Sequence, residues 1–235
     1  MLKKIGKYIF MIELGLKYIG IFKKTFFHPS ITLKPAYQQL SHDRQAYANS
    51  TLKFLNIEVE VIGSLPKEDK ILYAINHRSL LDILVMENIF SKSNKNGSWI
   101  AKKDLFDNVL YGKFFEYSGC MSVDLNNGKG MLKFFRSMKK TLAKVDDFNI
   151  YIFPEGERNK DKCILEFQSG AEKIAKANKL CIVPVFIEDT LEKVFADAPF
   201  EDKKTIRVFI GDVISEGDLT TNYKALMQTA SKGAC

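Results

Sequence analysis

The sequence predicts an α/β fold, with a central mixed β-sheet covered by helices and an N-terminal amphipathic helical pair in front of it. From residue 56 onward, short β-rich runs alternate with stretches of helical periodicity. Several runs are apolar on both faces, as in strands of a sheet that is covered on both sides. Before residue 56 the pattern is helical. We therefore expect a helical segment over residues 1–55 and an α/β domain over residues 56–235.

The composition fits a folded protein with one sizeable core, since 46% of the 235 residues are hydrophobic and 27% are charged. The net charge of +7 is compatible with nucleic acid, with anionic lipid or with solubility alone. The basic residues are dispersed and no nucleic-acid motif is visible, so we expect no nucleic-acid partner. The cysteines form no CxxC pair, which favours a reducing, cytosolic side.

Residues 3–22 form the first expected helix, and its apolar side chains recur at three- and four-residue steps. This stripe consists of Ile5, Ile9, Ile12, Leu16 and Ile19. Lys7, Glu13 and Lys17 interrupt the segment on the other side, and each is costly inside a bilayer, so we expect the helix to lie in the membrane interface. The alternative is that the stripe packs on the protein's own core. After the break at His28 and Pro29, residues 37–55 predict a second helix.

The strands and helices of the α/β domain follow from its β-rich runs and from the periodic stretches between them. Strands are expected at IEVEVI (57–62), ILYAI (71–75), SWIA (98–101), MSV (121–123), NIYIF (149–153), CIVPVFI (181–187) and TIRVFI (205–210). Helices are expected at residues 79–90, 130–144 and 169–178. In such sheets the binding sites lie on loops at the ends of strands.

One loop after a predicted strand carries a histidine and a carboxylate in NHRSLLD, residues 76–82. Ser79 is placed to cap the helix that contains Asp82, so His77 lies on the loop and Asp82 in the first helical turn. A carboxylate that accepts from one ring nitrogen leaves the other free to take a proton from a hydroxyl. No GxSxG elbow is present, so the activated hydroxyl belongs to a substrate. The histidines His28, His42 and His77 have no metal-binding spacing, and we expect no metal site.

A second loop reads FPEGERNK and offers an anion site. Gly156 permits close approach of the backbone, and Arg158 can bind a phosphate or carboxylate with two hydrogen bonds. Lys102 or Lys103, after the strand SWIA, adds a further positive charge for the same anion. Each of these patterns taken singly is also compatible with a solvated surface turn.

Four blocks in this order resemble the PlsC-like 1-acylglycerol-3-phosphate acyltransferases, a family of glycerolipid acyltransferases. The blocks are NHRSLLD, AKKDL with Gly112 and Gly119, FPEGER, and IVPV at residues 182–185. The resemblance covers roughly residues 55 to 215, and the first and third blocks are specific. The N-terminal helices also look like the monotopic membrane anchors of bacterial members.

The resemblance implies transfer of a fatty acyl group from acyl-CoA or acyl carrier protein to the sn-2 hydroxyl of lysophosphatidic acid, giving phosphatidic acid. It makes His77 the general base and Asp82 its orienting partner, with no acyl-enzyme and no cofactor beyond the acyl donor. The expected location is peripheral, on the cytoplasmic face of the cell membrane, in contact with its lipid surface.

The family's remaining motif positions imply two substrate-binding groups. The group that holds the acceptor's glycerol phosphate is Arg158, Lys102, Glu155 and Gly156. The group on the acyl-donor side is Val183 and Pro184.

Two departures from the family pattern concern the acceptor pocket. Leu125 stands where relatives often have arginine, and Glu157 stands where threonine is common. The acceptor's headgroup therefore stays open between lysophosphatidic acid and another lyso-lipid, such as a lyso-aminolipid. Two further classes also stay open: a hydrolase that gives the acyl group to water, and a non-enzymatic basic module that binds anionic lipid.

Overall fold

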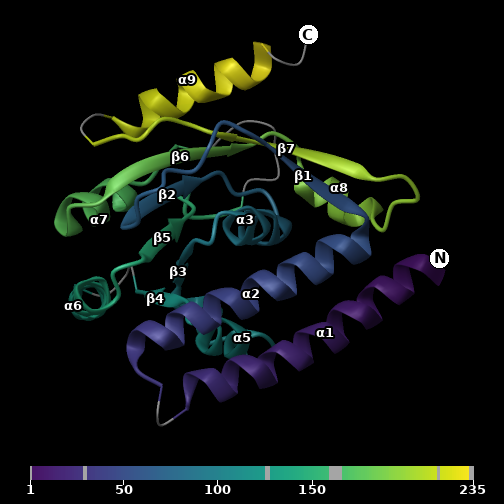
Figure 1. Ribbon diagram of the computed structural model, residues 1–235, viewed down its shortest axis with the longest axis horizontal. Helices are drawn as coiled ribbons and strands as arrows, with labels where there is room; N and C mark the ends of the chain where they lie inside the picture. Colours follow the sequence, from purple (N-terminus) through teal and green to yellow (C-terminus); the bar gives the residue numbers. More distant parts are fainter. Residues whose placement is uncertain (1, 29–30, 125–127, 159–165, 216–217, 233–235) are drawn as a thin grey trace.

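The protein is described here from a computed structural model, which covers residues 2–28, 31–124, 128–158, 166–215 and 218–232 (Figure 1). The helices are α1 (Leu2–Phe26), α2 (Leu33–Leu55), α3 (Leu81–Lys92), α4 (Lys103–Phe106), α5 (Gly112–Tyr117), α6 (Gly128–Lys144), α7 (Gly170–Asn178), α8 (Leu191–Asp197) and α9 (Leu219–Lys232). The strands are β1 (Ile57–Ile62), β2 (Ile71–Ile75), β3 (Asn96–Lys102), β4 (Met121–Val123), β5 (Phe148–Ile152), β6 (Cys181–Ile187) and β7 (Lys204–Ile210).

The sheet has seven strands in the order β1-β7-β6-β2-β5-β3-β4. The pairing between β6 and β7 is antiparallel, and the other neighbours are parallel. The predicted mixed sheet is therefore confirmed. Strand β2 lies between β5 and β6, with Leu72 opposite Ile150 on one side and Ile182 on the other. All five residues of β2 are buried, because the strand has neighbours on both edges and helices on both faces.

Two hydrophobic cores lie on opposite faces of the sheet. One contains Tyr73 and Ile75 of β2 with side chains from α2, α3 and α8, and the other contains Leu72 and Ala74 with side chains from α6, α7 and α9. Figure 1 shows the same layers, with α9 on one side of β6 and with α3 and α2 on the other. Alternate residues of one strand thus serve alternate cores, as the two-residue period of a strand requires.

The N-terminal helical pair is present, and α1 packs on α2 and α5 as an outer layer (Figure 1). Its inner face carries Leu14, Tyr18 and Phe22, which pack with Leu40 of α2. Along its outer face, Ile5, Ile9, Ile12 and Leu16 are all exposed, with Leu16 at 66%. Four of the five residues of the expected apolar stripe therefore face outward, and the fifth, Ile19, is half-buried. Among the described residues, no helix is both long and apolar enough to cross a membrane.

Lys7 lies on the side of α1 opposite the apolar stripe, as expected. It is 1% exposed. Its Nζ donates a hydrogen bond to the carbonyl oxygen of Phe195 at 2.7 Å and lies 4.6 Å from the centre of the Phe195 ring. Because Phe195 and Ala196 belong to the last turn of α8, the amine meets carbonyls that the helix leaves without a backbone partner. Lys7 thus fastens α1 to α8.

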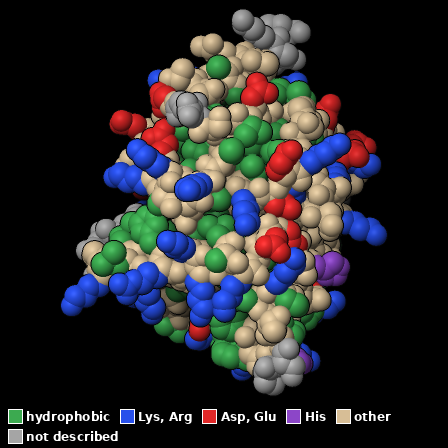
Figure 2. All heavy atoms as spheres, turned by 60° about the vertical axis from the view of Figure 1, so that its left-hand side comes forward, with side chains coloured by type: hydrophobic (Ala, Val, Ile, Leu, Met, Phe, Trp, Pro, Cys, Tyr) green, Lys and Arg blue, Asp and Glu red, His purple; other side chains and the backbone are tan. Residues whose placement is uncertain are grey.

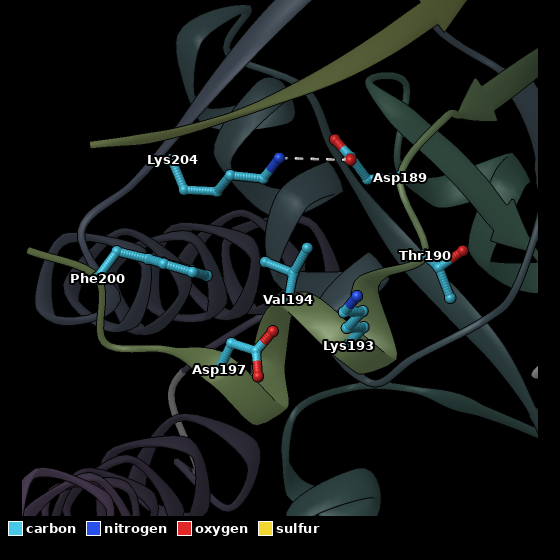
Figure 3. Close-up of a pocket in the computed structure, with 7 residues that line it drawn as sticks. All are labelled: Asp189, Thr190, Lys193, Val194, Asp197, Phe200 and Lys204. Atoms are coloured by element: carbon cyan, nitrogen blue, oxygen red, sulfur yellow. Dashed lines mark ion pairs between the residues drawn. The ribbon is translucent and has the colours of Figure 1, made fainter. Parts of the chain in front are cut away.

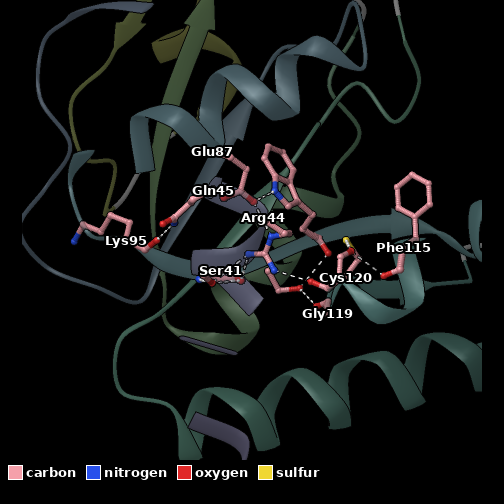
Figure 4. Close-up of polar contacts among 12 residues, drawn as sticks. Ser41, Arg44, Gln45, Glu87, Lys95, Phe115, Gly119 and Cys120 are labelled. Atoms are coloured by element: carbon pink, nitrogen blue, oxygen red, sulfur yellow. Dashed lines mark hydrogen bonds and ion pairs between the residues drawn. The ribbon is translucent and has the colours of Figure 1, made fainter. Parts of the chain in front are cut away.

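A buried ion pair joins α2 to α3 and to the sheet (Figure 4). Arg44 Nε donates to Glu87 Oε1 at 2.7 Å, and its two other nitrogens reach the carbonyls of Ser118 and Gly97, each at 2.7 Å. Burial alone lowers the pKa of Arg44, but Glu87 beside it reverses this effect, so the pKa lies above its usual value. The same pocket holds Cys120, and burial raises the pKa of its thiol. Helix α2 is therefore bonded to the α/β core, although it lies before the domain boundary that we expect at residue 55.

Candidate active site

The candidate site lies at one edge of the sheet, where β2, β5 and β3 end. These strands are parallel neighbours, with Ala74 opposite Ile152 and Trp99 opposite Tyr151. Because the carboxyl ends of parallel strands meet at one edge, the segments that follow the three strands lie together there. The loops that carry His77 and Glu155 are therefore neighbours, and Lys102 is the last residue of β3.

His77 and Asp82 are in direct contact. The distance between His77 Nδ1 and Asp82 Oδ2 is 2.9 Å. The same carboxylate oxygen accepts from the backbone amides of Arg78 at 2.6 Å and Ser79 at 2.8 Å, which fixes it in the first turn of α3. The Asp82 side chain is 2% exposed and the His77 side chain 13% exposed, so the imidazole keeps one open side. Helix α3 begins two residues later than expected, and the hydroxyl of Ser79 accepts from the amide of Leu81 at 3.2 Å.

Aromatic side chains fix the plane of the imidazole. The ring of Phe153 stacks on His77 with 3.7 Å between centroids and 10° between planes. Trp99 stacks behind Phe153 at 5.1 Å, and its Nε1 donates to Glu87 Oε1 at 2.8 Å. The buried pair of Glu87 and Arg44 thus holds the tryptophan that supports Phe153. Asp82 therefore restrains the edge of the imidazole, and Phe153 restrains its face.

Glu155 does not point outward to a substrate. Its carboxylate accepts a hydrogen bond from the backbone amide of His77 at 2.7 Å, and the residue is 3% exposed. The structure therefore gives Glu155 a contact with the backbone of the His77 loop, instead of the outward, acceptor-facing position that we expected. The turn that presents it is closed by Gly156, whose amide donates to the Phe153 carbonyl at 3.1 Å. Gly156 has φ +76°, which side chains other than glycine rarely adopt.

Asn76 and Tyr223 brace the base of the His77 loop. The side chain of Asn76 exchanges two hydrogen bonds with the backbone of Ile187, at 2.9 Å and 2.8 Å, and so extends the pairing of β2 with β6. The hydroxyl of Tyr223, on α9, donates to the carbonyl of Val185 at 2.7 Å. Burial raises the pKa of Tyr223 well above its usual value, so the phenol remains a neutral donor. Tyr223 lacks a motif signal. Asn76 begins the NHRSLLD block, but its contact with Ile187 depends on the order of the strands.

The two expected phosphate-binding cations belong to segments at the carboxyl ends of β3 and β5. Lys102 ends β3 and Arg158 follows the Glu155 turn, and both side chains are exposed. Lys103, the alternative to Lys102, forms an ion pair with Asp107. Glu157 is also exposed, whereas Leu125 lies outside the described residues. Lys102 and Arg158 therefore have the exposure that an anion site requires.

The fourth block lies in the interior and not at the open edge. Val183 pairs with Tyr73 in the middle of the β2–β6 ladder, and its side chain is fully buried in the core. Pro184 is buried too. Its ring packs against Gly211, where an added Cβ would lie 2.7 Å from Pro184 Cγ. The two residues expected on the acyl-donor side thus shape β6 next to the catalytic strand, without a face open to a donor.

A separate hollow lies beside α8 (Figure 3). Two amines and two carboxylates line it, with Lys204 Nζ 3.6 Å from Asp189 Oδ1. The lining residues are Asp189, Thr190, Lys193, Val194, Asp197, Phe200 and Lys204. The hollow includes none of the catalytic candidates, and its charges balance.

The fold and the contact between His77 and Asp82 define a class of protein: an α/β enzyme with an imidazole oriented by a carboxylate where its parallel strands end. Comparison with known proteins gives the family. The acyltransferase family model matches residues 56–188, and the chain belongs to this family.

Individual relatives agree with the family match. The chain is 31% identical over 179 residues to a 1-acyl-sn-glycerol-3-phosphate acyltransferase of Helicobacter pylori, covering 75% of this chain and 73% of the relative. It is 27% identical to a protein of the same name from Cocos nucifera, over 56% of this chain and 42% of that one. The crystal structure of the 1-acyl-sn-glycerophosphate acyltransferase PlsC from Thermotoga maritima shares the fold, with a TM-score of 0.67 at 19% identity, over 99% of this chain and 97% of that one.

Proposed function

We propose that the protein transfers a fatty acyl chain from acyl-CoA or acyl carrier protein to the sn-2 hydroxyl of 1-acylglycerol-3-phosphate, giving phosphatidic acid. The contact between His77 Nδ1 and Asp82 at 2.9 Å carries the proposal, because it leaves Nε2 as the nitrogen that takes the hydroxyl proton. The name shared by the Helicobacter and Cocos relatives supports the choice of acceptor.

The reaction proceeds without an acyl-enzyme. His77 Nε2 removes the proton as the acceptor's hydroxyl oxygen attacks the thioester carbonyl, and the new ester forms when the thiolate leaves. The imidazolium then returns its proton to the thiolate, so charge and protons balance. General-base catalysis of this kind contributes about 10²- to 10⁴-fold to a rate.

Lys102 and Arg158 hold the acceptor's phosphate in this proposal. Both are exposed and follow neighbouring parallel strands, so they frame the open side of the edge at which His77 lies. Binding the phosphate at a distance from the reacting hydroxyl orients the acceptor, which is the main way in which a two-substrate site lowers its barrier.

The protein acts on a membrane surface in this proposal, at its cytoplasmic face. The outward stripe of α1 supports this, since Ile12 is 62% and Leu16 66% exposed on one helix face. Apolar side chains at this spacing, with lysines beside them, are typical of a helix that lies in the interface of an anionic bilayer.

Vesicle sedimentation tests the membrane contact. The combined changes Ile9→Gln, Ile12→Gln and Leu16→Gln should release the protein from anionic vesicles, because they remove the apolar face without touching the packed one. Leu132→Gln is the matched control, since this leucine is 59% exposed on α6. Unchanged sedimentation of the triple variant would contradict the proposed contact between α1 and the membrane.

A product assay tests the reaction. Purified protein in anionic vesicles is given palmitoyl or oleoyl thioesters of CoA and of a carrier protein, together with a panel of lyso-lipids, and the products are identified by mass. We expect phosphatidic acid from 1-acylglycerol-3-phosphate. Product from a lyso-aminolipid alone would overturn the acceptor, and free fatty acid regardless of acceptor would identify a hydrolase.

A further inference from the structure

The segment between α4 and α5 exposes two aliphatic side chains almost completely. Val109 is 95% exposed and Leu110 89% exposed, more than the other large hydrophobic side chains that the structure describes as exposed. Water is a poor environment for such surface, and adjacent aliphatic side chains held out in this way indicate a contact made with something apolar.

Hydrogen bonds hold these side chains outward. The Oδ1 of Asn108 accepts from the amides of Leu110 at 2.9 Å and Tyr111 at 3.3 Å. The Asn108 carbonyl accepts from the amide of Gly112 at 2.9 Å. A Cβ on Gly112 would come within 2.2 Å of the Phe106 carbonyl oxygen, so glycine is needed where this turn closes against α4. The turn is therefore built to present Val109 and Leu110.

A chain of aromatic side chains joins this turn to the end of α1. Tyr111 contacts Phe115 of α5 at 6.0 Å between ring centroids. Further along α5, Tyr117 contacts Phe26 at 6.2 Å and Phe27 at 5.5 Å, and these two phenylalanines are 46% and 58% exposed. Val109 and Leu110 therefore lie in the turn that leads into α5, a helix whose other end contacts the end of α1.

Cations accompany this aromatic surface. Lys23 and Lys24 are exposed in the last turn of α1, and Lys113 Nζ lies 5.5 Å from the centre of the Tyr117 ring, where it also forms an ion pair with Glu116. Aromatic rings beside lysines are typical of proteins at the headgroup level of a membrane. An anionic bilayer therefore matches the exposed phenylalanines and lysines at the end of α1.

We propose that residues 107–111 are a second membrane contact, which inserts Val109 and Leu110 into the same bilayer on which α1 lies. The inference rests on the proposed contact between α1 and the membrane, and it adds a second membrane contact to the first. Because α4 follows Lys102 directly, this contact holds the phosphate-binding side of the catalytic edge at the lipid surface. A lysophospholipid can then reach His77 with its acyl chain still among the lipids.

Tryptophan probes measure separately whether each of the two contacts enters the bilayer. The native Trp99 is 3% exposed in the core and gives a constant background in each variant. Tryptophan is introduced at Leu110, at Ile12 on α1, or at Val213, which is 49% exposed after β7. Each protein is mixed with vesicles of phosphatidylglycerol and phosphatidylcholine that are brominated on their acyl chains.

We expect the bromine to quench the probes of Leu110→Trp and Ile12→Trp and to leave that of Val213→Trp unquenched. Quenching at position 12 without quenching at position 110 would overturn the second contact and leave the contact of α1 intact. Absence of quenching at both positions would overturn the membrane contact of α1 itself and this inference with it.

Substitution gives an independent measurement. Val109→Ser with Leu110→Ser should weaken vesicle affinity at least about tenfold, because two aliphatic side chains no longer enter the lipid. Val213→Ser, the matched control, should leave the affinity unchanged. Thermal unfolding should be the same in all three proteins, since exposed side chains contribute little to stability. Wild-type vesicle affinity in the folded double variant would refute the contact.

Discussion

His77 is restrained from three directions, by Asp82 of α3 and by two residues of the loop after β5. Asp82 contacts its Nδ1 at 2.9 Å, Phe153 stacks on its ring at 3.7 Å, and Glu155 accepts from its backbone amide at 2.7 Å. A misplacement of about 1 Å in such a group can cost about 10²-fold in rate. The arrangement therefore serves to hold the open nitrogen in place before substrates bind.

Phe153→Leu tests the stacking contact. The leucine keeps the apolar contact but has no flat face, so the imidazole is free to tilt, and we expect kcat to fall about tenfold or more with little change in KM for the acceptor. Phe153→Tyr keeps the ring and should restore most of kcat. A kcat for Phe153→Leu that equals the wild-type value would show that the stack does not position His77.

The sequence predicts the pair of His77 and Asp82, because five residues across a loop and a first helical turn bring the two side chains together in many packings. It does not predict Phe153 as a partner of His77. That contact requires β5 to lie beside β2, although the two strands are separated by two others in the chain. The sequence also does not predict that Glu155 points inward, since a carboxylate next to a glycine turn is usually exposed.

At the scale of elements, α2 is bonded to the sheet through Arg44. The guanidinium reaches Glu87 on α3 and the carbonyls of Gly97 and Ser118, so one side chain joins four segments. Glu87 in turn holds Trp99, which lies behind Phe153. The helical segment that precedes the expected domain boundary therefore also supports the catalytic edge.

Arg44→Met should destabilise the fold strongly, because it leaves the Glu87 carboxylate buried without its cation. Loss of one partner of such a pair costs about 3–5 kcal/mol, measured as the free energy of unfolding in denaturant. Lys203→Met is the control, since its pair with Glu58 is exposed and should contribute about 0–1 kcal/mol. Equal stability of the two variants would contradict a structural role for the buried pair.

Lys7→Met should loosen the start of α1. The change removes a charged donor to two carbonyls of α8 and should lower the free energy of unfolding by about 1.5–3 kcal/mol. Lys17→Met is the control, because Lys17 is exposed on the same helix. We expect protease cleavage within α1 to be faster in Lys7→Met only. Equal cleavage of both variants would contradict the fastening of α1 to α8.

Helices with a clear apolar period were predicted to within a few residues, as α6 and α7 show. The side of α1 that packs on α2 was not predicted, because α1 is apolar on two faces. The outer face carries Ile9 and Ile12, and the inner face carries Leu14 and Tyr18. Periodicity alone does not say which stripe meets α2. The short helices α4, α5 and α8 have seven residues or fewer, too few to show a period.

At the scale of the whole molecule, charge and apolar surface act together. The net charge is +7, and α6 contributes six exposed cations and no acidic residue (Figure 2). These cations are Lys129, Lys133, Arg136, Lys139, Lys140 and Lys144. Such a field attracts an anionic surface over about 8–10 Å at physiological salt. In the proposed function, the apolar stripe of α1 then makes the contact with the membrane at short range and brings the catalytic edge to the lipids.

The most direct measurement is the rate of acyl transfer by His77→Ala under single-turnover conditions. The variant should be folded, as judged by circular dichroism, and should bind anionic vesicles like the wild type. Its transfer rate should fall by about 10²- to 10⁴-fold, because the acceptor's hydroxyl loses its general base. A folded, membrane-bound variant that still forms phosphatidic acid at the wild-type rate would contradict the assignment of His77.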